Sequence, residues 1–157
     1  MKIYVILLKV HFGFAFIPNV SEELPEEVIH DRYGYFINDT IIDKVNKQND
    51  IIDKLDDECM TIYANVDNSD QIKYEHSMKM IRAERAMLIM LKEMWDMDYK
   101  KMKKTELYKE MKKALKKIDS MEGVEKEEYK VKRKKADKVL EAVHFLKLNL
   151  YKYNILA

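Results

Sequence analysis

Apolar residues recur at helical spacing in two well-separated stretches of the chain. In the first stretch, 41–62, the apolar positions alternate between intervals of four and three and are interrupted by Gln48: Ile41, Val45, Ile52, Leu55, Cys59 and Ile62. In the second stretch the same intervals occur without interruption: Ala136, Val139, Val143, Leu146, Leu150 and Tyr153. Such intervals place side chains on one face of an α-helix. Both series predict amphipathic helices, which could also associate as coiled-coil strands.

The stretch 71–121 contains neither Gly nor Pro and carries a broader apolar series. Its later members are displaced by about one position relative to a strict seven-residue repeat. Two interpretations remain open. A continuous helix of about 50 residues would form a rod of roughly 75 Å. Alternatively, the helix breaks near 103–105, where Thr105 could cap a new helix.

Two polar segments predict where these helices turn. Residues 65–70 are rich in Asn, Asp and Ser, and residues 119–123 end in Gly123. From residue 35 onward the chain has one glycine and no proline, whereas sheet proteins need turn residues every 8–12 positions or so. The sequence therefore predicts an all-α fold, either a helical bundle or a coiled-coil-like antiparallel helical hairpin of 71–121 against 125–153.

The N-terminal segment is different in character, because residues 3–17 are almost wholly apolar. We expect a buried strand, a β-hairpin or an apolar arm here, followed by a short helix over about 22–34. A secretory signal is the alternative, since Lys2 precedes the apolar run. However, Lys9 and His11 interrupt it and no small-residue cleavage site follows. The run is also too short and polar to span a bilayer, so we expect a cytoplasmic chain without membrane contact, or a secreted one if residues 1–17 act as a signal.

Charge divides the chain into halves of opposite sign. Residues 1–70 hold 6 Lys and Arg against 14 Asp and Glu, whereas residues 71–157 hold 23 against 14. Within one structural domain we distinguish an apolar arm (1–20), an acidic helical segment (21–66) and a basic helical hairpin (70–157). The two halves could attract each other within the fold or across a dimer, or the basic half could bind phosphate.

Motifs for catalysis are lacking in the sequence. Its three glycines cannot form a nucleotide-binding loop, and its single cysteine, Cys59, lies on a helical seam, where we expect an inert thiol. Two Glu-x-x-His patterns, Glu27 with His30 and Glu141 with His144, match the unit of di-iron carboxylate bundles, but their order along the chain does not. We therefore expect no enzymatic activity, no metal and no cofactor.

Two acidic residues, Glu84 and Asp98, fall in line with the apolar positions of 71–121. We expect both side chains to reach water at the edge of the apolar stripe, since buried acids are rare. The alternative is burial, which would require a basic partner from another helix and could set the register of packing.

The best candidate surface is the basic end of the predicted hairpin. Eight residues form it: Lys109, Lys112, Lys113, Lys116, Lys126, Lys130, Arg133 and Lys134. With one Arg and no interleaved Trp or Phe, it favours sequence-tolerant binding of nucleic acid over base readout. Ordinary solvated surface and contact with the acidic half are the alternatives.

A second candidate is an apolar interface seam on the last helix: Val139, Val143, Leu146 and Leu150. The sustained apolar series and the eleven methionines suit helix–helix contact. We therefore expect a non-enzymatic scaffold or adaptor that self-associates or binds a protein partner, with nucleic-acid binding as the alternative function.

Overall fold

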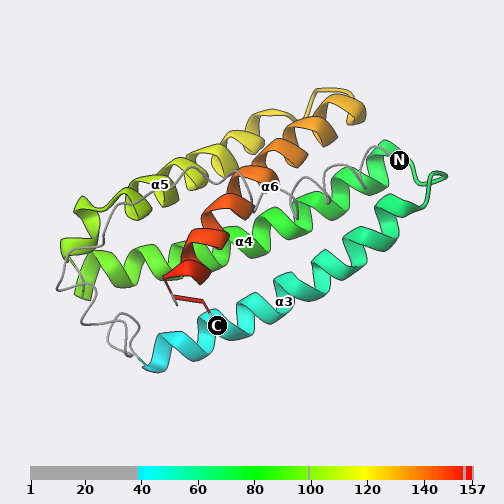
Figure 1. The fold of residues 1–157 in the computed structure, drawn as a ribbon. Coiled ribbons are helices and arrows are strands. Elements are labelled where there is room, and N and C mark those ends of the chain that lie inside the picture. The colour runs from blue at the N-terminus through cyan, green and yellow to red at the C-terminus, as the bar shows by residue number, and fades with distance from the viewer. Residues whose placement is uncertain (1–38, 99, 154, 157) are drawn as a thin grey trace.

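The computed structural model describes residues 39–98, 100–153 and 155–156. This part of the chain forms four α-helices: α3 (Asp39–Ala64), α4 (Asp70–Asp98), α5 (Glu106–Asp119) and α6 (Tyr129–Lys152). Two 3-10 helices, η3 (Lys100–Lys104) and η4 (Ser120–Gly123), flank α5. The α-helices alternate in direction and pack side by side (Figure 1). The predicted all-helical bundle is confirmed, while the arm over 1–20 and the helix over 22–34 lie outside the described residues.

The long apolar stretch is broken where Thr105 stands. Helix α4 ends at Asp98, and η3 leads into α5. The Thr105 hydroxyl donates a hydrogen bond to the Met102 carbonyl oxygen at 2.7 Å. The same hydroxyl accepts one from the Tyr108 backbone N–H at 3.2 Å, which satisfies a donor that the start of a helix leaves open. The interpretation as a broken helix is confirmed, and the rod of roughly 75 Å is wrong, because the chain reverses here.

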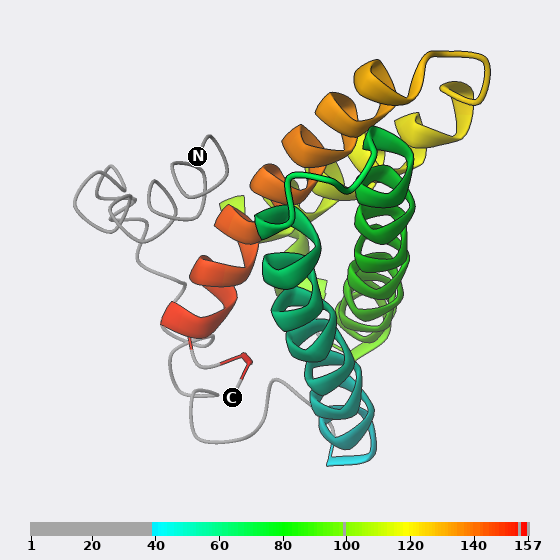
Figure 2. The ribbon, with the colours of Figure 1, turned by 90° about the vertical axis from the view of Figure 1, so that its right-hand side faces the viewer.

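Helix α4 is the centre of the bundle. Its buried side chains include Met87, Leu88, Leu91, Met94 and Trp95, none of which is measurably exposed. The helix packs against α3, α5 and α6, so apolar residues are needed around much of its circumference. Figure 2 shows α6 running obliquely past the antiparallel α3–α4 pair. The broad apolar series of the sequence therefore reflects a central helix with three neighbours.

The apolar series of α6 is covered by the chain's own helices. Val139, Val143, Leu146 and Leu150 are all buried in the core, where α6 packs against α4 and α5. These four residues were predicted to form an intermolecular seam. Because their surface is already removed from water within one chain, a contact between copies must use other residues.

Glu84 corrects a second expectation. Its side chain is buried, and Lys147 of α6 supplies the basic partner at 3.3 Å between Nζ and Oε1. Nearby, the Gln48 side-chain amide donates to the Ala83 carbonyl oxygen at 3.0 Å, and that of Asn49 donates to the Tyr151 hydroxyl at 2.8 Å. These contacts link α3 to both α4 and α6, and α6 to α4, through polar groups. The side chain of Asp98 lies outside the described residues.

Candidate interaction surfaces

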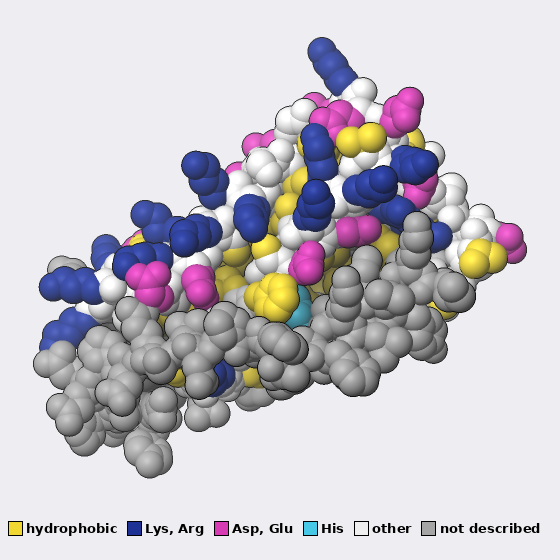
Figure 3. Space-filling model, turned by 45° about the horizontal axis from the view of Figure 1, so that its top comes forward, with side chains coloured by type: hydrophobic (Ala, Val, Ile, Leu, Met, Phe, Trp, Pro, Cys, Tyr) yellow, Lys and Arg dark blue, Asp and Glu magenta, His cyan; other side chains and the backbone are white. Residues whose placement is uncertain are grey.

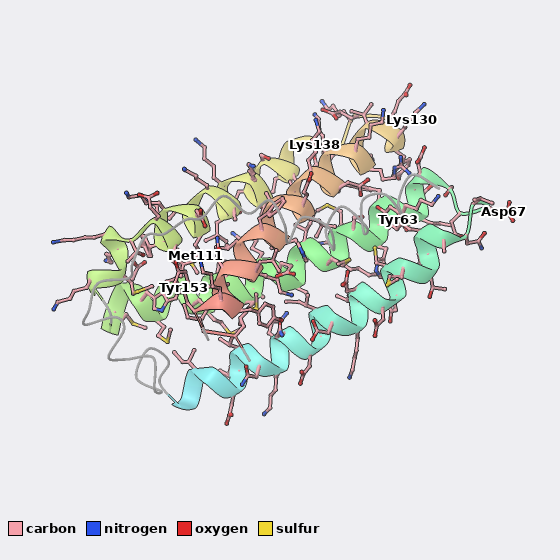
Figure 4. The ribbon with its side chains drawn as sticks, viewed as in Figure 1. Tyr63, Asp67, Met111, Lys130, Lys138 and Tyr153 are labelled. Carbon is pink, nitrogen blue, oxygen red and sulfur yellow. The ribbon has the colours of Figure 1, made fainter. Side chains whose placement is uncertain are left out.

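Exposed lysines follow the outer sides of α5 and α6. We call them the lysine face: Lys112, Lys113, Lys116 and Lys117 on α5, with Lys130, Lys134 and Lys138 on α6. All seven are exposed because the inward positions of both helices are taken by core residues. Figure 3 shows Lys and Arg side chains projecting over this side of the molecule, with acidic ones scattered among them. In Figure 4, Lys130 and Lys138 lie on the outer side of α6, away from the interior.

The spacing within α6 makes the lysine face a continuous row. Lys130, Lys134 and Lys138 are four residues apart, so they lie one above another along the helix, with successive residues about 6 Å apart. None of the three forms an ion pair with a described residue. Among the described residues, ion pairs of α6 run to Asp70, Glu84 and Glu127.

The structure brings together part of the basic cluster that the sequence predicted. Six of its residues are exposed, as expected: Lys112, Lys113, Lys116, Lys126, Lys130 and Lys134. Lys109 is also exposed but pairs with Glu106 on the same helix. Arg133 differs, because it is half-buried and its Nε lies 3.2 Å from Asp70 Oδ1. Arg133 therefore connects α6 to the start of α4 and is not part of the lysine face.

Lys117 and Lys138 are members of the lysine face that sequence reasoning missed. Each stands four residues after a predicted member, Lys113 and Lys134 respectively. That interval was the available signal, because residues four apart share a side of a helix.

Helix α3 carries a row of carboxylates on its outer side. We call it the acidic stripe: Asp43, Asp50, Asp53 and Asp57. Asp50, Asp53 and Asp57 follow the i, i+3, i+7 spacing of one helix side, and Asp43 continues the row one heptad earlier. All four are exposed, and none pairs with a described residue. Met60 extends the same side, since it lies seven residues after Asp53 and is 50% exposed.

The two charged surfaces lie on different edges of the bundle. Helices α3 and α5 both pack on α4, and Figure 1 shows them on opposite sides of it. Consequently the acidic stripe does not neutralise the lysine face within one chain. A large apolar side chain, Phe145, is 46% exposed and stands seven residues after Lys138 on the same side of α6. Each charged surface thus has an exposed apolar residue beside it.

Polar groups inside the bundle form structural links between its helices. The Tyr63 hydroxyl donates to Asp137 Oδ1 at 2.7 Å and lies 2.7 Å from Ser77 Oγ, which joins α3, α4 and α6. Ser77 is fully buried, so it cannot meet a substrate.

Burial, with a smaller effect of Asp56 and Asp137, raises the pKa of the Cys59 thiol to about 12. A thiol with this pKa stays protonated at neutral pH and is a poor nucleophile.

The described residues contain no group of three or more His, Cys, Asp or Glu side chains placed to hold a metal ion. Glu141 is exposed on α6, and Glu27 and His30 lie outside the described residues.

Across the part of the chain that is described, no helix combines the length and apolar character needed to cross a membrane. No protein-family model, curated protein or solved structure matches the chain.

Proposed function

We propose that this protein is a non-enzymatic assembly protein, in which the acidic stripe of one copy docks on the lysine face of the next. The observation that carries the proposal is the presence of two charged surfaces of opposite sign, on separate edges of one bundle. Neither finds its counter-charges among the described residues of its own chain. Opposite patches of this kind steer two molecules together and fix their orientation.

Charge alone would make such a contact weak. Exposed ion pairs typically contribute about 0.2–1 kcal/mol each. Three or four such pairs therefore leave little net binding free energy once the entropic cost of association is subtracted. An exposed apolar side chain lies beside each surface, Phe145 beside the lysine face and Met60 beside the acidic stripe. Burying these side chains in the contact would add a favourable hydrophobic contribution to binding. Large aromatic side chains commonly anchor interfaces within a polar rim. We infer a moderate affinity that depends on both charge and Phe145.

The proposed contact is heterologous, because it joins two different surfaces. A heterologous contact builds a ring if its rotation closes and an open chain of subunits if it does not. An open chain would present an unused acidic stripe at one end and an unused lysine face at the other, whereas a ring would leave neither unused. The apolar seam of α6 has no part in this arrangement, since its residues belong to the core of each subunit.

A charge exchange tests the proposal. The acid-swapped variant carries Asp50→Lys, Asp53→Lys and Asp57→Lys, and the lysine-swapped variant carries Lys113→Glu, Lys134→Glu and Lys138→Glu. The acid-swapped variant presents two basic surfaces, and in the lysine-swapped variant three glutamates cancel most of the charge of the four lysines that remain on the lysine face. Each variant alone should therefore be monomeric by sedimentation velocity. Their mixture pairs opposite charges again and should assemble. The native protein should assemble at low salt and dissociate as salt screens the charges.

The matched control places the same charge change elsewhere. Asp67, Glu93 and Glu122 are exposed and lie outside α3, so replacing all three by Lys alters net charge equally and should leave assembly intact. A Phe145→Ser variant, which leaves net charge unchanged, should weaken assembly. A native protein that stays monomeric at low salt, or swapped variants that fail to assemble when mixed, would contradict the proposal.

A further inference from the structure

We propose that the lysine face also binds the phosphate backbone of nucleic acid, in competition with the acidic stripe of a neighbouring copy. The binding surface follows from the lysines themselves, and the competition rests on the assembly proposed above. The result would be an assembly that nucleic acid takes apart. Subunits joined to one another would have their lysine faces covered, and subunits on nucleic acid would have them occupied.

Charge density decides which ligand is preferred. Asp50, Asp53 and Asp57 present three carboxylates over a helix length of about 10 Å. Duplex DNA presents about six phosphate charges over the same length. Cations on two adjacent helices can meet a phosphate backbone without the exact register that a protein partner requires. Nucleic acid is therefore expected to displace the acidic stripe at low salt.

The chemistry of the lysine face predicts binding without sequence preference. Bidentate recognition of guanine is the usual task of arginine, and the face contains none. Arg133 is held by Asp70, and Arg85 pairs with Asp119 at 2.9 Å between Nε and Oδ1. Lysine acts as a mobile point charge, which suits backbone phosphates. Each phosphate contact releases counterions, so affinity should fall steeply with salt.

The test measures fluorescence anisotropy of a labelled 20-base-pair DNA of random sequence, at salt concentrations from low to physiological. Replacing Lys113, Lys134 and Lys138 by Gln should reduce the slope of log Kd against log salt by about 3, roughly one unit per lysine. The matched control replaces three exposed lysines of α3, Lys44, Lys47 and Lys54, by Gln and should preserve the slope. Circular dichroism checks that both variants keep native helix content.

A second variant tests the competition. Replacing Asp50, Asp53 and Asp57 by Asn removes three of the four carboxylates of the competing stripe and leaves the lysine face unchanged. This variant should not self-associate and should bind DNA more tightly than the native protein at concentrations where the native protein assembles. Equal affinity would overturn the competition. Absence of DNA binding by this variant at low salt would overturn the nucleic-acid site itself, whether or not the native protein assembles.

Discussion

Glu84 is a carboxyl group in the core, and its titration should be visible in the stability of the protein. Burial raises the pKa of Glu84 to about 7, against the opposing effect of Lys147, while Asp53 and Asp56 add like charge. The unfolded chain releases this proton near its ordinary pKa of 4.5, so the folded state binds the proton more tightly. Its contribution to stability is therefore complete below pH 4.5 and is lost as pH rises to about 7.

This linkage gives a prediction for the pH profile. The contribution of Glu84 to the free energy of unfolding should fall by on the order of 3 kcal/mol between those two pH values. Chemical denaturation at several pH values measures the change. The comparison variant, Glu84→Gln with Lys147→Met, removes the carboxylate and its partner together and so strands neither charge. If the native protein and this variant have parallel pH profiles, the proposed titration of Glu84 is wrong.

Cys59 offers a direct measure of burial around α3. Because burial raises the pKa of Cys59 from 9.0 to about 12, the folded protein should hold on the order of a thousand-fold less thiolate than the unfolded chain at pH 8. Alkylation by iodoacetamide should accordingly be far slower in buffer than in denaturant, and mass spectrometry follows both reactions. Comparable rates would show that α3 detaches readily from α4.

At the scale of single elements, Thr105 is the residue on which the start of α5 depends. Thr105→Ala removes the hydroxyl that caps the helix and bonds to the Met102 carbonyl oxygen. The loss should cost about 1 kcal/mol of stability, measured by urea unfolding. Thr105→Ser retains the oxygen and should recover most of the loss. Equal stability of the Ala and Ser variants would mean that packing, and not the cap, fixes this turn.

Local sequence accounts well for the helices and less well for their partners. The apolar intervals in 41–62 and 136–153 predicted α3 and α6, because helical spacing is a local property. The break at Thr105 remained open, since a cap and a continuous helix are close alternatives in 71–121. The burial of Glu84 could not be foreseen, because Lys147 stands 63 positions away and only the packing of α6 on α4 brings them together.

At the scale of the molecule, the sequence revealed the charged residues of the candidate surfaces but not how the helices that carry them pack. The opposite charges of the two halves were evident in the sequence, and so was most of the lysine face. The sequence could not show that α3 and α5 pack on opposite sides of α4, which keeps the two charged surfaces apart among the described residues of one chain. Arg133 was misassigned for a related reason, since its partner Asp70 is remote in sequence. The apolar seam was assigned to a partner because intramolecular and intermolecular helix packing use the same pattern.

The whole molecule permits a final prediction about the form of the assembly. In an open chain of subunits, each copy gives one acidic stripe and one lysine face. The lysine-swapped variant (Lys113→Glu, Lys134→Glu and Lys138→Glu) retains the acidic stripe, so it can dock on a native subunit. It cannot receive a further copy, and it should end the chain. Small amounts of it should therefore shorten native assemblies in proportion to its mole fraction, as measured by light scattering.

A closed ring would respond differently, because one defective subunit prevents closure and leaves open fragments in place of a graded series of lengths. The acid-swapped variant (Asp50→Lys, Asp53→Lys and Asp57→Lys) should act with the same potency at the other end, since the contact has two distinct sides. The control with Lys at positions 67, 93 and 122 should join the assembly without shortening it. If one swapped variant ends chains and the other has no effect, the two surfaces do not contact each other, and the head-to-tail arrangement is wrong.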